Sequence, residues 1–315
     1  MRPALALLGL LVLASLPWWV DAHWQVLALR ALMYSLVVLS FSLVAGQLGL
    51  VSLLQTSFAG LAGYAVAVLG VQQGWPAGAA VAAALALVLA SAALFGLVSL
   101  RAQGIGFMML TLALGQMVWA LCFQWVDVTQ GMDGISGVAP PVVAGIDFGQ
   151  PQAFYALVLA LVALAFWLAQ RLVDSRFGLL LRGIQDNAVR MRALGHPVLQ
   201  ARLLFFVLAS VPAGIGGILL AWETRVVTPV SLDLSRAVFV LTAAVIGGTR
   251  SLAGVPLGIV LMVALEAVVS RYTERHLAVF GTVLVASVLL QPGGLVTWFQ
   301  RRSPAAPAPH STRTP

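Results

Sequence analysis

Residues 76–100 read PAGAAVAAALALVLASAALFGLVSL, a run without a single charged side chain. The hydrocarbon core of a bilayer is about 30 Å thick, and a helix needs about 20 apolar residues to cross it. The run is therefore long enough to span a membrane as one helix. Similar apolar stretches recur along the chain, so this pattern decides the class of the whole protein.

The composition agrees with that class. Of the 315 residues, 61% are hydrophobic and only 9% are charged, whereas soluble domains carry about 25% charged residues. These values exclude a soluble enzyme, a disordered scaffold and a secreted disulfide-rich module. The one cysteine, Cys122, has no partner for an internal disulfide and is expected to be a buried thiol. We predict an all-α, polytopic membrane protein with about eight to ten transmembrane helices.

Ten apolar stretches are candidate spans. The first follows Arg2 and has the length of a signal peptide, but a second long span starts almost at once, which favours an uncleaved helix. Residues 1–300 are expected to form one transmembrane domain, and the polar, proline-containing residues 301–315 a disordered cytoplasmic tail. The expected spans are residues 4–20, 24–45, 50–71, 76–100, 104–126, 152–170, 203–222, 237–248, 252–270 and 276–291.

The charged residues predict the orientation of these spans. Residues 171–202 contain six arginines against two acids, and residues 127–151 contain three aspartates and no basic residue. Because positively charged loops stay in the cytoplasm, we expect the N-terminus and residues 171–202 inside and residues 127–151 outside. The same rule accounts for the formal net charge of +7 without a nucleic-acid partner. Arg30 and Glu266 fit this scheme poorly.

The expected inside loop contains a patterned stretch, SRFGLLLRGIQDNAVRMRALGHP at residues 175–197. Four of its small or apolar residues follow one another at spacings of four, three and four: Ile184, Ala188, Met191 and Gly195. This spacing predicts one short amphipathic helix over residues 183–195, which ends at the glycine before Pro197. Such a helix lies on lipid headgroups, solvates a loop, or docks into another protein.

Four segments resemble one known family. The first comprises Ser-Arg-Phe-Gly at 175–178, Arg-Gly-Ile-Gln-Asp-Asn at 182–187 and Ala-Leu-Gly at 193–195. Together they look like the cytoplasmic loop of LivM-type permeases, the membrane subunits of branched-chain amino acid ABC importers. The other three, in the order of the family, are GLVSLLQTSFAGLAGY at 49–64, QGMDGISG at 130–137 and VIGGTRSLAGVPLG at 245–258.

The chain departs from the family pattern at several of these positions and resembles a divergent member. The departures are Leu50, Leu54, Arg190, Met191, Thr249 and Val255. The resemblance implies a non-catalytic permease of the bacterial inner membrane that carries a branched-chain or other hydrophobic amino acid, or a related amide or urea. It also implies two ABC ATPase subunits, a second homologous permease and a periplasmic substrate-binding protein. The chain has no Walker A motif, so ATP is expected on the partner subunits alone.

The resemblance assigns helix 183–195 to contact with the ATPase. Small residues there allow a close approach, and charged residues supply contacts; the candidate coupling residues are Arg182, Asp186, Ala188, Arg190, Arg192 and Gly195. On the outer side, residues 127–151 are rich in glycine and proline, which predicts a shaped loop. This loop is either a connector or, through Asp127, Asp133 and Asp147, part of the surface that accepts the binding protein.

Polar residues also cluster inside an expected span. Ser52, Gln55 and Thr56 either pack between helices or border the permeation path, since polar groups in lipid need partners or a wet cavity. Ala59 and Gly63, four residues apart, predict a close helix crossing. No metal-ligating or catalytic set is recognisable among the four scattered histidines and the acids.

A stand-alone secondary transporter is the alternative function. It needs a carboxylate within the membrane, and Glu266 is the candidate. Glu266 lies near the outer end of its span with Arg271 close by in the sequence, which favours a structural ion pair. Short-range pairs are likewise expected for Glu223 with Arg225 and for Asp233 with Arg236.

Overall fold

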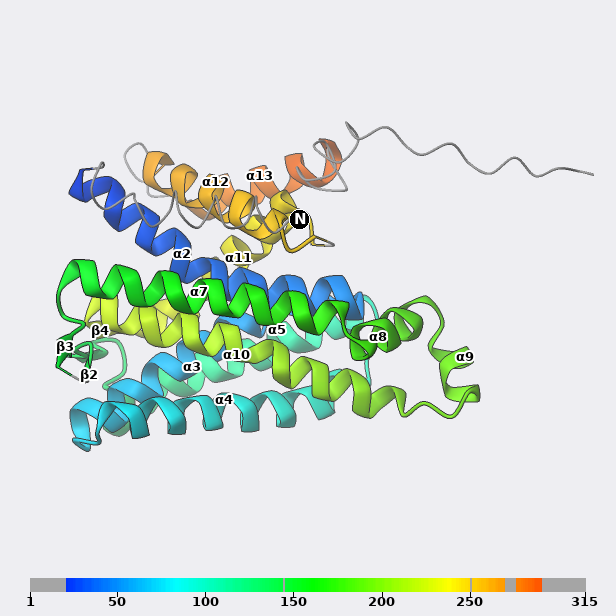
Figure 1. The fold of residues 1–315 in the computed structure, drawn as a ribbon, viewed down its shortest axis with the longest axis horizontal. Helices are drawn as coiled ribbons and strands as arrows, with labels where there is room; N and C mark the ends of the chain where they lie inside the picture. Colours follow the sequence, from blue (N-terminus) through cyan, green and yellow to red (C-terminus); the bar gives the residue numbers. More distant parts are fainter. Residues whose placement is uncertain (1–20, 144, 250, 270–275, 291–315) are drawn as a thin grey trace, which may run out of the picture.

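The structure is a helical bundle (Figure 1), which confirms the predicted all-α class. It is a computed structural model that describes residues 21–143, 145–249, 251–269 and 276–290. Within these ranges five helical segments are long and apolar enough to cross a membrane. They are α2 (Ala22–Leu43) with its π-helical continuation η1 (Val44–Leu48), α4 (Ala77–Ser99), α5 (Ile105–Gln124), α7 (Pro151–Asp174) and α10 (Val198–Thr224).

Shorter apolar helices occupy the other expected spans within the described ranges. They are α3 (Gln55–Ala67) with its π-helical continuation η2 (Val68–Gln72), α11 (Leu234–Gly247), α12 (Gly254–Val269) and α13 (His276–Leu290). Each expected span from the second to the tenth therefore contains a helix. The first expected span, residues 4–20, and the expected tail, residues 301–315, lie outside the described residues.

The third span begins later than predicted. Residues 50–54 are not helical, and α3 starts at Gln55 instead of Leu50. The reason lies one residue before this stretch, where Gly49 has a left-handed φ of +68° that ends η1 and turns the chain. Ser52 therefore lies in the turn before α3, whereas Gln55 and Thr56 open the helix.

The crossing of α3 and α10 packs the middle of the bundle. Gly217 in α10 lies so close to α3 that a Cβ there would overlap the carbonyl oxygen of Ala59. One turn along α3, a Cβ at Gly63 would lie 3.3 Å from the carbonyl oxygen of Gly217. This confirms the close crossing predicted from Ala59 and Gly63. Beside it, the rings of Phe58 and Phe206 meet edge to face with centroids 6.0 Å apart.

Short elements close the end of the bundle at which α7 begins (Figure 1). They are α6 (Val126–Thr129), β1 (Ile135–Ser136), β2 (Val142–Val143), β3 (Ile146–Asp147), β4 (Val226–Val227) and the 3₁₀ helix η3 (Pro229–Leu232). Strand β1 pairs antiparallel with β4, and β2 with β3. This arrangement confirms that the glycine-rich segment after α5 is a shaped loop.

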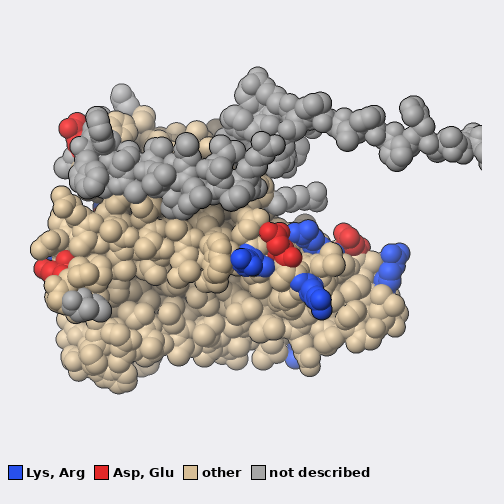
Figure 2. Space-filling view, viewed as in Figure 1, with Lys and Arg blue, Asp and Glu red and all other residues tan. Residues whose placement is uncertain are grey.

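The two ends of the bundle differ in charge. At one end, α8 (Arg176–Asp186) and α9 (Ala188–Ala193) extend beyond the long helices (Figure 1), and Figure 2 shows arginine atoms gathered there. The loop with β1–β4 closes the opposite end, and an uncharged band separates the two on this face (Figure 2). We call them the arginine-rich end and the aspartate-rich end. Such a band is what a lipid bilayer requires.

The short-range ion pairs predicted for Glu223 with Arg225 and for Asp233 with Arg236 are not among the salt bridges of the described residues. Glu223 at the end of α10 pairs with Arg30 of α2, with Nε and Oε1 3.3 Å apart. Glu266 of α12 pairs with Arg236 of α11 at 2.8 Å. Both poorly fitting charges thus find partners on neighbouring helices, because a charge near hydrocarbon is costly unless it is paired. The expected partner of Glu266, Arg271, lies outside the described residues.

Candidate functional site

The segment at the arginine-rich end contains two helices, so the predicted single helix over residues 183–195 is wrong. Asn187 has an extended backbone, with φ −156° and ψ 93°, and separates α8 from α9. Its side-chain Oδ1 accepts a hydrogen bond from the backbone N–H of Arg190 at 2.9 Å. Asparagine is a favoured N-cap because it satisfies one free donor of the first turn. The helix therefore stops and restarts there.

One face of this α8–α9 segment packs on the bundle. Leu181 and Ile184 are almost fully buried, and Met191 of α9 packs against the core. Three of the four residues chosen from helical spacing, Ile184, Ala188 and Met191, thus face inward, whereas Gly195 is exposed. The outward face carries two other apolar residues, Val189 and Leu194, with 74% and 67% of their surface exposed.

The candidate coupling residues occupy this segment with different exposures. Arg182, Asp186, Arg190, Arg192 and Gly195 are exposed, and Ala188 is half-buried. Arg182 also reaches back to α7, because its Nη2 donates a hydrogen bond to the carbonyl oxygen of Val173 at 3.4 Å. Gly195 has a left-handed φ of +85° and ends α9 as predicted. The exposed apolar and cationic residues together form a surface suited to a protein partner.

Helix α8 also contacts the turn that precedes α3. A Cβ at Gly49 would lie 2.8 Å from Nε2 of Gln185, so the glutamine side chain lies directly over this glycine. Ser175 caps the start of α8 by accepting a hydrogen bond from the N–H of Gly178 at 3.3 Å. The α8–α9 segment is thus attached to α7 on one side and to η1 on the other.

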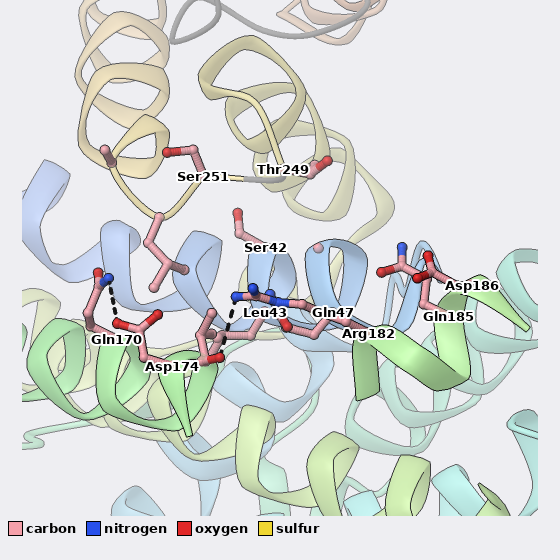
Figure 3. Close-up of a pocket in the computed structure, with 14 residues that line it drawn as sticks. Ser42, Leu43, Gln47, Gln170, Asp174, Arg182, Gln185, Asp186, Thr249 and Ser251 are labelled. Carbon is pink, nitrogen blue, oxygen red and sulfur yellow. Dashed lines mark hydrogen bonds between the residues drawn. The ribbon is translucent and has the colours of Figure 1, made fainter. Parts of the chain in front are cut away.

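A cavity of about 890 Å³ opens beside α8 (Figure 3). Its walls come from the ends of α2 and α7, from η1, from α8 and from the α11–α12 connection. Most of the lining side chains are polar or charged: Ser42, Gln47, Gln170, Asp174, Arg182, Gln185, Asp186, Thr249 and Ser251. Two candidate coupling residues, Arg182 and Asp186, therefore also face a cavity, which helical spacing did not indicate.

The polar residues expected at the permeation path lie inside the bundle. Ser52, Gln55 and Thr56 are all at least 95% buried. The hydroxyl oxygen of Ser40 in α2 lies 2.5 Å from Oε1 of Gln55 and 2.5 Å from the carbonyl oxygen of Ala209 in α10. The structure thus joins Ser40 and Gln55 in a polar cluster where α2, α3 and α10 meet, whereas Ser52 and Thr56 bond to the backbone of their own turn.

The amide of Gln55 lies beside the hydroxyl of Ser40, which has one proton for two neighbouring oxygens, Oε1 of Gln55 and the carbonyl oxygen of Ala209. With the two ends of the amide exchanged, Nε2 donates to this hydroxyl while the hydroxyl donates to Ala209, so the cluster satisfies its own hydrogen bonds.

The three candidate aspartates lie on the opposite end. Asp127 is exposed on α6, Asp133 in the turn before β1, and Asp147 on β3. Oδ1 of Asp147 accepts a hydrogen bond from the N–H of Gly149 at 2.7 Å. Exposed apolar side chains adjoin them, among which Met132 has 65% of its surface exposed. The structure therefore places the three acids, all exposed, in the loop at the same end of the bundle.

Comparison with known proteins identifies the family. Residues 25–288 match the family described as branched-chain amino acid transport system / permease component. The chain belongs to this family. It is 25% identical, over 94% of its own length and 75% of the relative, to the high-affinity branched-chain amino acid transport system permease protein LivM of Escherichia coli (strain K12).

Other relatives of this permease are of two kinds. LivM of Salmonella typhimurium is likewise 25% identical over 75% of its length. The probable branched-chain amino acid transport permease protein LivH of Methanocaldococcus jannaschii is 24% identical, over 61% of this chain and 64% of the relative. No solved structure matches this permease. It is thus a divergent LivM-type permease.

Proposed function

We propose that this permease is the non-catalytic membrane subunit of an ABC importer for branched-chain or other hydrophobic amino acids, or a related small amide or urea. Its arginine-rich end, with residues 171–202 and the N-terminus, lies in the cytoplasm of a bacterial inner membrane, in accordance with the positive-inside rule. Two ATPase subunits bind there and carry the ATP, and a second homologous permease completes the membrane part. The observation that carries the proposal is the projecting α8–α9 segment with its exposed Val189, Leu194 and arginines.

The contacts of α8 connect the segment that docks on the ATPase to the transmembrane helices. When the ATPase pair closes around ATP, it displaces the docked segment. The displacement reaches η1 through Gln185 on Gly49 and α7 through Arg182 on the carbonyl oxygen of Val173. Packed elements move as units because cores resist continuous deformation. The ends of α2, α3 and α7 therefore shift together, which is the alternating access that import requires.

The polar cluster suits brief passage of a zwitterion. Ser52, Gln55 and Thr56 carry no charge, so they offer hydrogen bonds without a tight electrostatic site. At the aspartate-rich end, Asp127, Asp133 and Asp147 form a surface for a substrate-loaded binding protein. Complementary charge at this surface increases the association rate and improves the orientation of the binding protein more than it increases the affinity.

Co-purification in mild detergent tests this proposal. An ATP-hydrolysing subunit is expected to accompany the intact permease and to be lost from the double variant Arg190→Glu, Arg192→Glu, because reversed charges repel their former partners. The variant Arg225→Glu, at the opposite end, is the matched control and retains the subunit. If no ATPase accompanies the well-folded intact chain, or if the double variant retains it fully, the proposal is refuted.

A further inference from the structure

The cavity beside α8 holds two buried polar groups that nothing in the bundle satisfies. Ser42 has 1% of its surface exposed and Gln47 has 8%, and both line the cavity. Oγ of Ser42 and Oε1 of Gln47 have no hydrogen-bond partner among the described residues. Buried polar atoms of native proteins nearly always have partners. The hydroxyl of Ser42 is thus free to donate and accept a hydrogen bond, and the amide oxygen of Gln47 to accept one, from a small molecule bound in the cavity.

Charges of both signs line the same cavity. Arg182 uses one N–H for the carbonyl oxygen of Val173, and it forms no ion pair within the described ranges. Asp174 accepts one hydrogen bond, from Nε2 of Gln170 to Oδ2 at 3.1 Å. A guanidinium binds a carboxylate in a two-pronged geometry, whereas a carboxylate and an amide oxygen bind an ammonium group. Figure 3 shows Arg182 extended toward Gln47, with Asp174 on the neighbouring helix.

An apolar wall completes the site. Leu43 of α2, Val173 of α7 and Leu252 of the α11–α12 connection line the same cavity. The volume of about 890 Å³ lies in the range of small-molecule pockets, and it exceeds that of one amino acid, so the guest keeps part of its water. Such a loose site favours weak, readily reversed binding.

We infer that this cavity is an inward-facing binding site for an apolar α-amino acid, with Arg182 on the carboxylate, Gln47 and Asp174 on the ammonium group, and the apolar wall on the side chain. Because α8 forms one wall, an occupied site restrains the element that transmits ATPase movement. Amino acid that accumulates inside the cell therefore slows its own import. This second part rests on the proposed function, which supplies the orientation and the role of α8.

Direct binding tests the site without transport. The permease complex in lipid nanodiscs, free of binding protein, is titrated with tritiated leucine. Saturable binding is expected, and Gln47→Leu and Arg182→Gln are each expected to weaken it about ten-fold or more, since each removes a partner of a charged group. Gln103→Leu, an exposed change at the same end but outside this cavity, is the matched control and binds like wild type. Absence of saturable binding to monodisperse complex, or equal binding by all four proteins, overturns the inference.

Uptake tests the regulation. Proteoliposomes contain the complex, with ATP inside and binding protein outside. They are loaded with increasing concentrations of unlabelled leucine, and uptake of labelled leucine is measured. The uptake of each variant is normalised to its own uptake without internal leucine. Internal leucine is expected to inhibit wild type and Gln103→Leu, and Gln47→Leu is expected to need about ten-fold more. Equal inhibition of all three overturns the regulatory part while the importer function stands. Uptake that needs no ATP instead refutes the proposed function and leaves the binding result to decide the site.

Discussion

The crossing of α3 and α10 is the most sharply testable packing feature of this permease. Gly217→Ala places a methyl group onto the carbonyl oxygen of Ala59, so the two backbones must separate by on the order of 1 Å. Overpacking typically costs 1–3 kcal/mol, and the upper value of about 3 kcal/mol applies because the obstacle is backbone. Alanine gains up to about 1 kcal/mol in helix propensity over glycine, which leaves a net loss of about 2 kcal/mol.

The control is Gly281→Ala, since a Cβ at this helical glycine meets nothing within 4 Å. Unfolding is followed by the fluorescence of the nine tryptophans during denaturant titration in mixed micelles. The free energy of unfolding is expected to fall by about 2 kcal/mol for Gly217→Ala and to stay level or rise slightly for Gly281→Ala. If Gly217→Ala unfolds at the wild-type midpoint, α3 and α10 do not cross as described.

Three further changes test other parts of the account. Gln55→Leu removes the acceptor beside Ser40 and is expected to cost about 1 kcal/mol of stability but several-fold in leucine uptake by vesicles; unchanged uptake would remove Gln55 from the path. Glu266→Gln removes the charge that pairs with Arg236 at 2.8 Å but keeps a side-chain oxygen as a hydrogen-bond acceptor, so ATP-dependent uptake is expected to stay intact; loss of uptake in the folded variant would favour an ion-coupled transporter. Asn187→Ala removes the cap of α9 at a cost of about 1 kcal/mol, and trypsin is expected to cut the α8–α9 segment about five-fold faster; an unchanged rate would mean that the cap does not hold α9.

Hydropathy predicted the helices well because lipid imposes a strict requirement. Within hydrocarbon every backbone polar group must be bonded internally, so long apolar stretches such as residues 76–100 have few alternatives to a helix. The same constraint explains why the charges gather at the two ends of the bundle and why the loop after α5 could be recognised from its glycines and prolines.

Local turns and distant pairs were harder to predict. The late start of α3 depends on one backbone angle at Gly49, and the break between α8 and α9 depends on the conformation of Asn187, whereas both stretches have an unbroken helical pattern of apolar residues. The pairing of Glu223 with Arg30 joins residues 193 positions apart, so no rule of local spacing could find it. The cavity beside α8 was missed for the same reason, because its walls come from segments far apart in the sequence.

The projecting segment also shows where spacing misleads. Helical periodicity selected Ile184 and Met191, which pack inward. The outward Val189 and Leu194 could have been suspected only as apolar residues in an otherwise polar stretch. Once α9 is treated as a separate helix that starts at Ala188, these two residues turn away from the bundle.

Site-specific cross-linking shows directly whether the α8–α9 segment binds an ATPase subunit. The single native cysteine, Cys122, is buried, so Val189→Cys introduces an accessible thiol at the exposed face, and Met132→Cys does the same at the opposite end. A thiol-reactive photocross-linker is attached in membranes, and captured polypeptides are tested for labelling by azido-ATP. Val189→Cys is expected to capture an ATP-binding subunit, and Met132→Cys is expected not to capture one. Capture of that subunit by Met132→Cys, or by neither variant in a transport-active membrane, would contradict this expectation.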